Sequence, residues 1–395
     1  QISIESTDYV GLTGIDSLLT AFIVNQGGID GLVFSLAGGS DLCLRDNGNT
    51  GTVVYLGKDA VVATPPVDLS GSGACDEEVL PPPPPVAETR KYTPGHYTFL
   101  IRRNGSHTAM RNSVRPGVVG IVKRYTWRSL EPALGQYDFS EIESDLQLVA
   151  SQGMQLVAMI EDKTFTEEVP LPKYLESDQY VRANRVGGYT AVRWSPYVVT
   201  RLKALISALG QSVDAHPNFE GIATQETAPS LDDPILDATG YTPEKYRDAL
   251  IDVLSDATSS LPTSRIFWYM NFLPRNNGYL AEVASAVQSL GVVMGAPDVM
   301  PDNQALVKHT YPLFDQFKGT MPMFGQVEQV CYRHLHDDTS YPTKYWTMQE
   351  LFDFGRDNMH LNYMFWVRVG KPNPSDSYSW YYALPVMANN PVINP

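Results

Sequence analysis

The feature that most restricts the fold is a regular alternation, beyond residue 117, of short apolar segments with longer amphipathic ones. The short segments have the length of β-strands, and the segments between them repeat apolar residues with the period of an α-helix. Strands that alternate with helices form parallel sheets. The sequence predicts eight such strands, at residues 118–123, 156–160, 190–194, 221–225, 266–271, 292–295, 323–328 and 362–367.

Helix start signals support this alternation. Ser140 with Glu143, and Thr347 with Glu350, have the spacing of a capping box, in which each side chain bonds the other residue's backbone N–H. Eight strand–helix units in about 300 residues match the (β/α)8 TIM barrel, and a doubly wound sheet is the alternative. We therefore predict an α/β chain with a (β/α)8 barrel.

Five consecutive prolines at residues 81–85 interrupt the chain before this alternation begins. Such a run cannot form a helix or an inner strand and acts as a stiff spacer. The segments before it are short, apolar and separated by Gly, Asp and Asn, which is typical of small β-structures. We predict a small all-β accessory module at 1–80, a proline-rich linker at 81–88 and a catalytic barrel at 89–395.

The three cysteines and the first residue bear on the compartment. Cys43 and Cys75 could form a disulfide in an oxidising compartment or remain two unrelated thiols, and Cys331 is then expected to be a free, buried thiol. The chain begins at Gln1 rather than Met, as expected after removal of a signal peptide. We expect a secreted, extracellular or periplasmic protein.

The charge of the chain excludes some partners. The formal net charge is −15, so the surface repels phosphate backbones and gives no basis for binding nucleic acid. No run of about 18 apolar residues predicts a membrane span. A neutral small molecule or polymer is the better expectation, and nothing in the sequence implies an obligate protein partner.

Two glutamates stand where barrel enzymes place their reactive groups. The fourth predicted strand leads to Glu226 and the seventh ends in Glu328. Active sites of (β/α)8 barrels lie at the carboxyl ends of the strands, and these two strand ends face each other across the barrel mouth. Hydrolysis of a glycoside requires a pair of carboxyl groups, about 5 to 5.5 Å apart in retaining enzymes. A single acidic residue at such a place is more often a cap or an ion-pair partner.

This pairing resembles clan A of the retaining glycoside hydrolases, in which the acid/base follows strand four and the nucleophile follows strand seven. Residues 127–132 (WRSLEP) and 135–140 (GQYDFS) look like the loop after strand one of these enzymes, and residues 217–223 (PNFEGIA) look like the approach to their acid/base. The resemblance covers about residues 90–395 and implies that Glu226 is the acid/base and Glu328 the nucleophile. The exact family is not assigned.

One position departs from the clan pattern. Most members have Asn directly before the acid/base, where it binds the sugar 2-hydroxyl, and this chain has Gln225. A longer amide could do the same work from a slightly displaced backbone. Trp366 resembles the clan's aromatic floor under the sugar. The remaining candidates for substrate binding are Asn271, Tyr269, Trp127, Trp194 and Arg124, for which packing or internal ion pairs are the alternative.

Other chemistries find less support. The stretch His334 to Asp338 contains possible metal ligands, but its spacing is not that of a known site, so a polar loop is the better interpretation. No Gly-x-Ser-x-Gly elbow and no nucleotide-binding glycine fingerprint is present. We predict no metal and no cofactor.

The sequence therefore predicts a secreted retaining glycoside hydrolase that cleaves a β-linked polysaccharide or oligosaccharide. The best expectation is an endo-β-1,4-glucanase, or else a related β-mannanase or xylanase. Residues 169–175 (VPLPKYL) resemble a loop after strand two of some β-galactosidases, which makes an exo-acting enzyme of that type the alternative. A barrel that binds carbohydrate without cleaving it is the alternative from another class.

Overall fold

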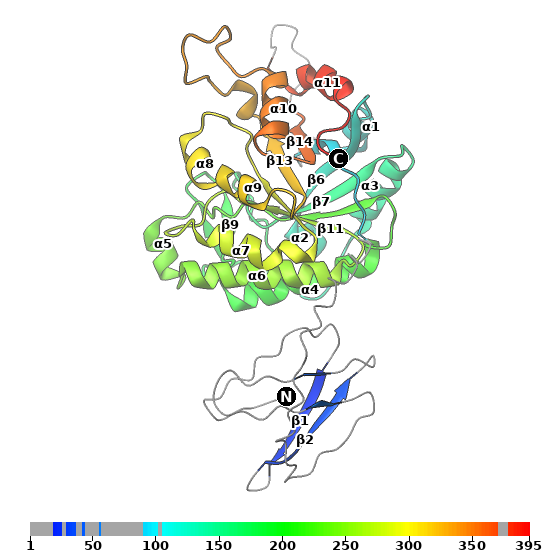
Figure 1. Cartoon of the computed structure of the whole chain (residues 1–395), viewed down its shortest axis with the longest axis vertical. Coiled ribbons are helices and arrows are strands. Elements are labelled where there is room, and N and C mark those ends of the chain that lie inside the picture. Colours follow the sequence, from blue (N-terminus) through cyan, green and yellow to red (C-terminus); the bar gives the residue numbers. More distant parts are fainter. Residues whose placement is uncertain are drawn as a thin grey trace. The chain divides into compact units, whose positions relative to one another are not determined.

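The chain divides into two compact units, Gln1–Val86 and Ala87–Pro395 (Figure 1). This computed structural model describes residues 90–101, 105–369 and 378–395, together with four short strands of the first unit. The domain boundaries at residues 80 and 88 remain predictions.

The described strands of the first unit form two antiparallel pairs. Strand β1 (Leu19–Asn25) pairs with β2 (Ile29–Leu36), and β3 (Leu42–Cys43) pairs with β4 (Tyr55–Leu56). These pairs agree with short predicted strands, but the rest of residues 1–89 lies outside the described part, so the all-β module remains a prediction. The proline run, Cys75 and the side chain of Cys43 also lie outside the described residues, so the linker and the possible disulfide remain predictions.

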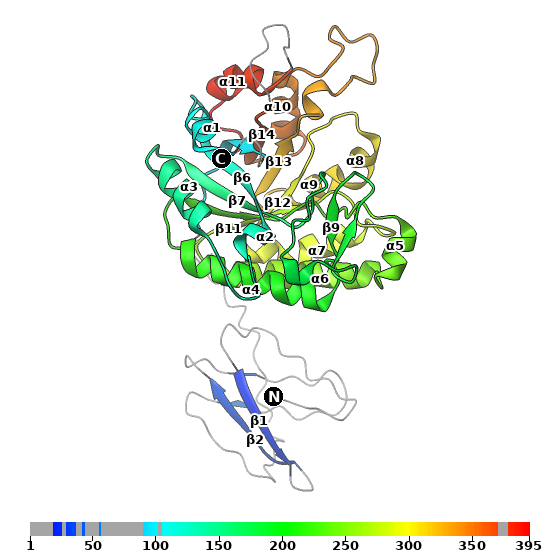
Figure 2. The ribbon, with the colours of Figure 1, turned by 180° about the vertical axis from the view of Figure 1, so that it is seen from behind.

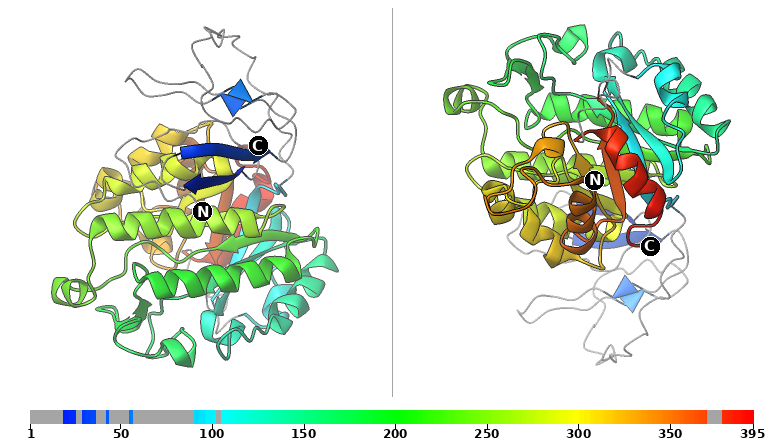
Figure 3. Two further views of the ribbon diagram at one scale, coloured as in Figure 1. Left: turned by 90° about the horizontal axis from the view of Figure 1, so that it is seen from below. Right: turned by 90° about the horizontal axis from the view of Figure 1, so that it is seen from above.

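The second unit contains a closed barrel of eight parallel strands, which confirms the predicted fold class. The first strand of this barrel pairs with the last, so the sheet has no free edge. In chain order the strands are β5 (Gly95–Leu100), β6 (Val118–Thr126), β7 (Gln155–Glu161), β10 (Phe219–Ala223), β11 (Arg265–Tyr269), β12 (Val292–Ala296), β13 (Met323–Val327) and β14 (Tyr363–Val367). The views from below and from above in Figure 3 show helices packed on the outside of these strands.

One predicted strand is wrong and one barrel strand was missed. Residues 190–194 do not enter the barrel, because β9 (Tyr189–Ala191) pairs only with β8 (Val181–Ala183) in a two-stranded sheet outside it. The first barrel strand is instead β5, whose polar His96 and Thr98 obscure its apolar pattern in the sequence. The two errors cancel, so β10 and β13 are the fourth and seventh barrel strands as predicted. The loop that begins at Trp127, however, follows the second strand rather than the first.

The helices of the barrel unit surround the strands, and the long helices α4 and α6 lie side by side (Figures 2 and 3). Their bounds are α1 (His107–Arg111), α2 (Trp127–Leu130), α3 (Ser140–Ala150), α4 (Pro196–Val213), α5 (Asp233–Ala238), α6 (Pro243–Ser260), α7 (Tyr279–Val287), α8 (Gln304–His309), α9 (Tyr311–Phe317), α10 (Met348–Asp357) and α11 (Trp380–Asn389). Short 3-10 turns lie at η2 (Lys173–Leu175), η3 (Gln288–Leu290) and η4 (Cys331–Arg333). No helix in the described part of the chain is long and apolar enough to cross a membrane.

The two predicted capping boxes have different outcomes. At the start of α10, Thr347 accepts from the backbone of Glu350 and Glu350 bonds back to Thr347, which confirms this box. The box at Ser140 and Glu143 is wrong, because Ser140 already lies inside α3. Its hydroxyl donates to Asp138 at 2.6 Å instead.

Aromatic side chains fill the interior of the barrel. Successive residues of a strand point to opposite sides of the sheet, so every second residue faces inward. Phe267, Phe324, Tyr363 and Phe365 meet there, with ring centroids 5.1 to 5.6 Å apart between Phe267 and the other three. Gly295 makes room for Phe324, because a Cβ at this position would lie 2.2 Å from the phenyl ring. This packing closes the barrel below its mouth.

Candidate active site

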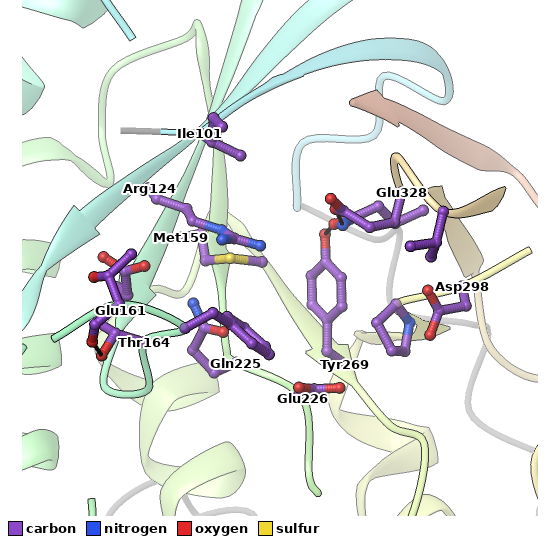
Figure 4. Close-up of a pocket in the computed structure, with 15 residues that line it drawn as sticks. Ile101, Arg124, Met159, Glu161, Thr164, Gln225, Glu226, Tyr269, Asp298 and Glu328 are labelled. Carbon is purple, nitrogen blue, oxygen red and sulfur yellow. Dashed lines mark hydrogen bonds between the residues drawn. The ribbon is translucent and has the colours of Figure 1, made fainter. Parts of the chain in front are cut away.

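A pocket of about 480 Å³ opens among the loops that follow the carboxyl ends of the strands (Figure 4). This is the end of the barrel at which barrel enzymes carry out their chemistry. Both glutamates predicted to be catalytic line it. The complete lining consists of Ile101, Arg124, Met159, Glu161, Thr164, Phe165, Thr166, Gln225, Glu226, Tyr269, Pro297, Asp298, Gln326, Glu328 and Val330.

Glu226 lies three residues past the end of β10 and is held through both carboxylate oxygens. The Lys163 ammonium donates to Oε1 at 2.6 Å, and the Asn271 amide donates to Oε2 at 2.6 Å. The side chain of Lys163 is fully buried, whereas 16% of the Glu226 side chain is exposed. Glu226 is therefore fixed from behind and open towards the pocket.

Lys163 belongs to a short network that shapes the loop after β10. Its ammonium also donates to the Ala228 carbonyl at 2.7 Å and to the Ser230 hydroxyl at 2.9 Å. Burial lowers the pKa of Lys163, and the nearby Glu226 carboxylate partly offsets this shift by favouring the charged amine. One buried cation thus sets both the backbone path and the charge environment of Glu226.

The backbone of Glu226 is also fixed. Arg193 forms a two-pronged salt bridge with Asp162, at 2.7 and 2.6 Å, and donates to the Glu226 carbonyl at 2.6 Å. Such fork-shaped pairs are geometrically specific. Asp162 follows β7 directly, and its carboxylate is occupied by Arg193.

Glu328 follows directly after β13 and has a different environment. The Gln326 amide donates to Glu328 Oε2 at 2.6 Å, and the Tyr269 hydroxyl donates to Gln326 Oε1 at 2.7 Å. This chain of bonds orients the Gln326 amide so that its N–H groups face Glu328. Burial raises the pKa of Tyr269 well above its usual value, so its hydroxyl remains a donor.

Besides Glu161, Glu226 and Glu328, the pocket contains the carboxyl group of Asp298, on the loop after β12. Burial, followed by the charges of Glu226 and Glu328, raises the pKa of Asp298 to about 7. Figure 4 shows Glu328, Asp298 and Glu226 around Tyr269.

Two further predicted residues reach the pocket. Gln225 is 7% exposed, and its buried Nε2 has no hydrogen-bond partner within the described part of the chain. Arg124 lies with its guanidinium 5.0 Å from the centroid of the Phe99 ring, and its buried Nε likewise lacks a partner among the described residues. Buried donors are usually bonded, so both groups are suited to bind substrate oxygens.

The structure does not bring the three predicted tryptophans to the pocket. Trp366 is fully buried and donates to His96 at 3.0 Å, which is incompatible with the predicted stacking on a sugar. It lies on β14 between the inward-facing Phe365 and Val367, so strand alternation turns it towards the helices. Trp127 and Trp194 are buried in the same outer core, with their indole N–H groups donating to Glu131 and Thr239.

Asn271 contacts a residue of the pocket without lining the pocket itself. It lies past the end of β11, but it holds Glu226 and does not line the pocket. Its side-chain oxygen accepts from Ala228 and Phe272 backbone N–H groups at 2.9 and 2.7 Å. Asn271 is thus placed to position a carboxylate rather than to contact a sugar.

The histidine-rich stretch after β13 forms a packed loop. The His336 ring stacks on Tyr341 at 3.8 Å and lies 4.2 Å from Trp346, measured between centroids. His334 accepts from the backbone of Asp302 at 3.2 Å. Among the described residues, no cluster of three or more His, Cys, Asp or Glu side chains is arranged to hold a metal ion.

Sequence reasoning missed Lys163 and Gln326. Lys163 follows the strand end Glu161 by two residues, and its position in the sequence gives no sign that it reaches the loop after the next barrel strand. Gln326 had a signal that could have been used, because it lies two residues before Glu328 and therefore on the same face of the strand. Cys331 is a buried free thiol, as predicted.

Comparison with known proteins supports the fold. No protein-family model and no curated protein sequence matches the chain. Among solved structures, it is similar to a GH5_18 protein from Bifidobacterium longum subsp. infantis, with 14% identity, a TM-score of 0.53 and coverage of 77% of this chain and 80% of that one. It is also similar to GH5_18 from Streptomyces cattleya in complex with GlcNAc, with 13% identity, a TM-score of 0.50 and coverage of 76% and 80%. The chain therefore shares its barrel fold with these two solved structures.

Proposed function

We propose that this protein is a retaining glycoside hydrolase, with Glu328 as nucleophile and Glu226 as acid/base. The observation that carries the proposal is that both glutamates line one pocket at the barrel mouth, after the fourth and seventh strands. Each is held by buried hydrogen-bond donors, and the two sets of donors are different. A pair of carboxyl groups in distinct environments is what double displacement at a sugar requires.

The mechanism divides the work between them. Glu328 attacks the anomeric carbon and forms a glycosyl ester, while the leaving oxygen takes a proton from Glu226. Glu226 then removes a proton from water, which displaces Glu328 and releases the sugar. Gln326 presents an N–H to Glu328 and fixes the direction from which it attacks.

The remaining pocket residues suit a sugar substrate. The unpartnered amide N–H of Gln225 and the Arg124 guanidinium are donors for hydroxyl groups. Phe165 is 46% exposed although it lines the pocket, so its ring is free to stack on a sugar face. Phe165 thus provides the aromatic contact that was expected from Trp366.

Within this class we propose an endo-acting β-1,4-glucanase first, with β-mannan and xylan as the next substrates. An exo-acting, β-galactosidase-like enzyme is the alternative. The support is the resemblance of the motif around residues 217–226, and an N-terminal module that would raise the local concentration of a polymer. We also propose that the protein acts outside the cytoplasm, because its linker and Cys43 and Cys75 suit an extracellular enzyme.

The test is a panel of soluble β-glucans, mannan, xylan and aryl β-glycosides, offered to the wild type, Glu226→Gln and Glu328→Gln. We expect hydrolysis of one substrate group by the wild type, with the β-anomer released first. Glu328→Gln should lower kcat by at least about a thousandfold, because it removes the nucleophile.

Activity that survives in Glu328→Gln would remove the nucleophile assignment, and an α-anomer as first product would replace retention by inversion. Binding of a glycan by the wild type without any hydrolysis would favour the non-catalytic barrel. Release of single sugars from chain ends, rather than a rapid fall in viscosity, would favour the exo-acting alternative.

A further inference from the structure

Asp298 is a carboxyl group of the pocket to which neither catalytic role has been assigned. It follows β12 by two residues and lines the pocket together with Glu226 and Glu328 (Figure 4). The charges of both glutamates act on it. It follows a different strand from Glu226 and Glu328, and the proposed function did not use it.

Among the described residues, no cation forms a salt bridge with this carboxyl group. The Cys331 thiol donates to Asp298 Oδ1 at 3.8 Å, which is a weak bond, and the Tyr311 hydroxyl reaches only the backbone carbonyl, at 3.3 Å. In the described part of the chain Asp298 has no salt-bridge partner. The buried ammonium group of Lys163, which lies near the pocket, pairs with Glu226 instead. A half-buried carboxyl group that shares a pocket with the carboxyl groups of Glu226 and Glu328 and has no cation beside it favours its protonated form, in agreement with a pKa raised to about 7.

Glu226 has the opposite arrangement. Both its oxygens accept a hydrogen bond, from the Lys163 ammonium and from the Asn271 amide. This is the bonding pattern of a carboxylate that is ready to act as a base. The first half of double displacement, however, requires Glu226 to deliver a proton. Another titratable group of the pocket can supply that proton.

We propose that Asp298 stores the proton that Glu226 delivers to the leaving glycosidic oxygen, an inference that rests on the proposed function. When substrate binds, the Asp298 proton passes to Glu226 through a sugar hydroxyl or a solvent molecule. Glu328 attacks, the glycosidic C–O bond breaks, its electron pair stays on the leaving oxygen, and that oxygen takes the proton. In the second half a water proton goes to Glu226 and returns to Asp298, so the cycle closes.

A pH dependence follows from this role. Asp298 holds its proton below about pH 7 and loses it as the pH rises through that value, so the glycosylation rate should fall there. The groups that face Asp298 are Glu226, Glu328, the Cys331 thiol and the Tyr311 hydroxyl. Burial raises the pKa of both Cys331 and Tyr311, so neither ionises near pH 7.

The test compares wild type and Asp298→Asn on two aryl glycosides of the same sugar. One carries an unsubstituted phenyl group, whose oxygen needs a proton to leave, and the other a dinitrophenyl group that leaves without one. We expect Asp298→Asn to lower kcat/KM about a hundredfold for the first and less than about threefold for the second, because only acid assistance is lost. In Asp298→Asn, the fall in the glycosylation rate near pH 7 should disappear. Asp315→Asn, which removes an exposed carboxylate paired with His360, is the matched control and should change neither rate nor profile.

Equal losses on both glycosides, or none on either, would overturn the proposal. A second readout needs no turnover: the infrared band of a protonated carboxyl group should be lost in the wild type through about pH 7 and be missing at lower pH from Asp298→Asn. If that band persists in Asp298→Asn, the proton resides elsewhere and the proposal is wrong. If the band behaves as expected but no glycoside is cleaved, the proposed function fails, and proton delivery by Asp298 to a glycosidic oxygen is rejected with it.

Discussion

The surroundings of Glu226 and of Glu328 differ although both residues are glutamates at the mouth of one barrel. Glu226 is bonded to a buried ammonium group and to the Asn271 amide, and Arg193 fixes its backbone. Within the described residues, the Glu328 carboxylate accepts from a neutral amide, which the Tyr269 hydroxyl orients in turn. The first region is held by charges and the second by neutral hydrogen bonds.

This difference teaches how one residue type can serve two roles. A group that exchanges a proton benefits from a nearby ionisable partner, and Lys163 and Asp298 provide two around Glu226. A nucleophile must remain ionised and well directed, and a fixed neutral donor directs it without neutralising its charge. The roles can therefore be separated by experiment.

The largest effects should come from removing each carboxyl group and offering a small anion in its place. In Glu328→Gly, azide should restore turnover of an activated aryl glycoside and give an α-glycosyl azide, because it attacks from the face that Glu328 vacates. In Glu226→Gly, azide should give the β-product, because the ester on Glu328 still forms. Product configuration by NMR is the measurement. The same configuration from both variants would abolish the distinction between the two regions.

The next largest effect should come from Lys163→Met. Loss of the ammonium group leaves Glu226 without the partner that holds it, and we expect kcat/KM to fall by about a hundredfold. Breaking a buried pair should also cost about 3 kcal/mol in the free energy of unfolding. Kinetics and denaturant unfolding measure both.

Lys203→Met is the control for this substitution. Lys203 pairs with Asp252 on the surface, where such pairs contribute less than about 1 kcal/mol. A Lys163→Met enzyme with the kinetics of this control would show that the charge beside Glu226 has no role.

A smaller effect is expected on the other side, for Tyr269→Phe. This change removes the bond that orients Gln326 and leaves a buried amide oxygen without its donor, at a cost of about 1 to 3 kcal/mol. We expect kcat to fall about tenfold, with little change in KM. In Tyr363→Phe, the matched control, the lost hydroxyl bonds Glu220 inside the barrel at 2.8 Å, so stability should fall while kcat is kept. Equal kcat values in the two variants would contradict the role of Gln326.

The smallest effect on activity should come from Trp366→Phe. Because Trp366 is buried behind the barrel and bonded to His96, we expect a loss of about 1 to 3 kcal/mol in stability and a KM within about twofold of the wild type. Thermal unfolding and substrate titration measure the two. A large rise in KM would restore the predicted sugar contact.

The sequence was sufficient for the barrel and for the positions of Glu226 and Glu328, because apolar periodicity and strand ends are local signals. The sequence was less informative about the side of the sheet to which each side chain points. Trp366 and Phe365 are adjacent and both aromatic, yet only the alternation of the strand decides which one faces the interior. The outer core accepts large aromatic residues as readily as a binding site does, so composition alone could not separate them.

The contacts that set the charge environment of the pocket could not be predicted from the sequence, for another reason. Lys163, Glu226 and Asn271 lie on the loops after three different strands, and Asp298 lies on the loop after a fourth. Their meeting depends on barrel closure and loop paths, which no short motif encodes. Burial, which decides the proton affinity of Asp298, appears only when the loops are assembled.

The central claim, that Glu328 is the nucleophile and Glu226 is not, is tested most directly by trapping the intermediate. A 2-deoxy-2-fluoro glycoside with a good leaving group, of the sugar that the panel identifies, should form a stable ester with the enzyme, and mass spectrometry of its peptides locates the ester. We predict one sugar per chain, on the peptide that contains Glu328. An adduct on Glu226 or Asp298, or turnover that proceeds without any trapped sugar, would contradict the account.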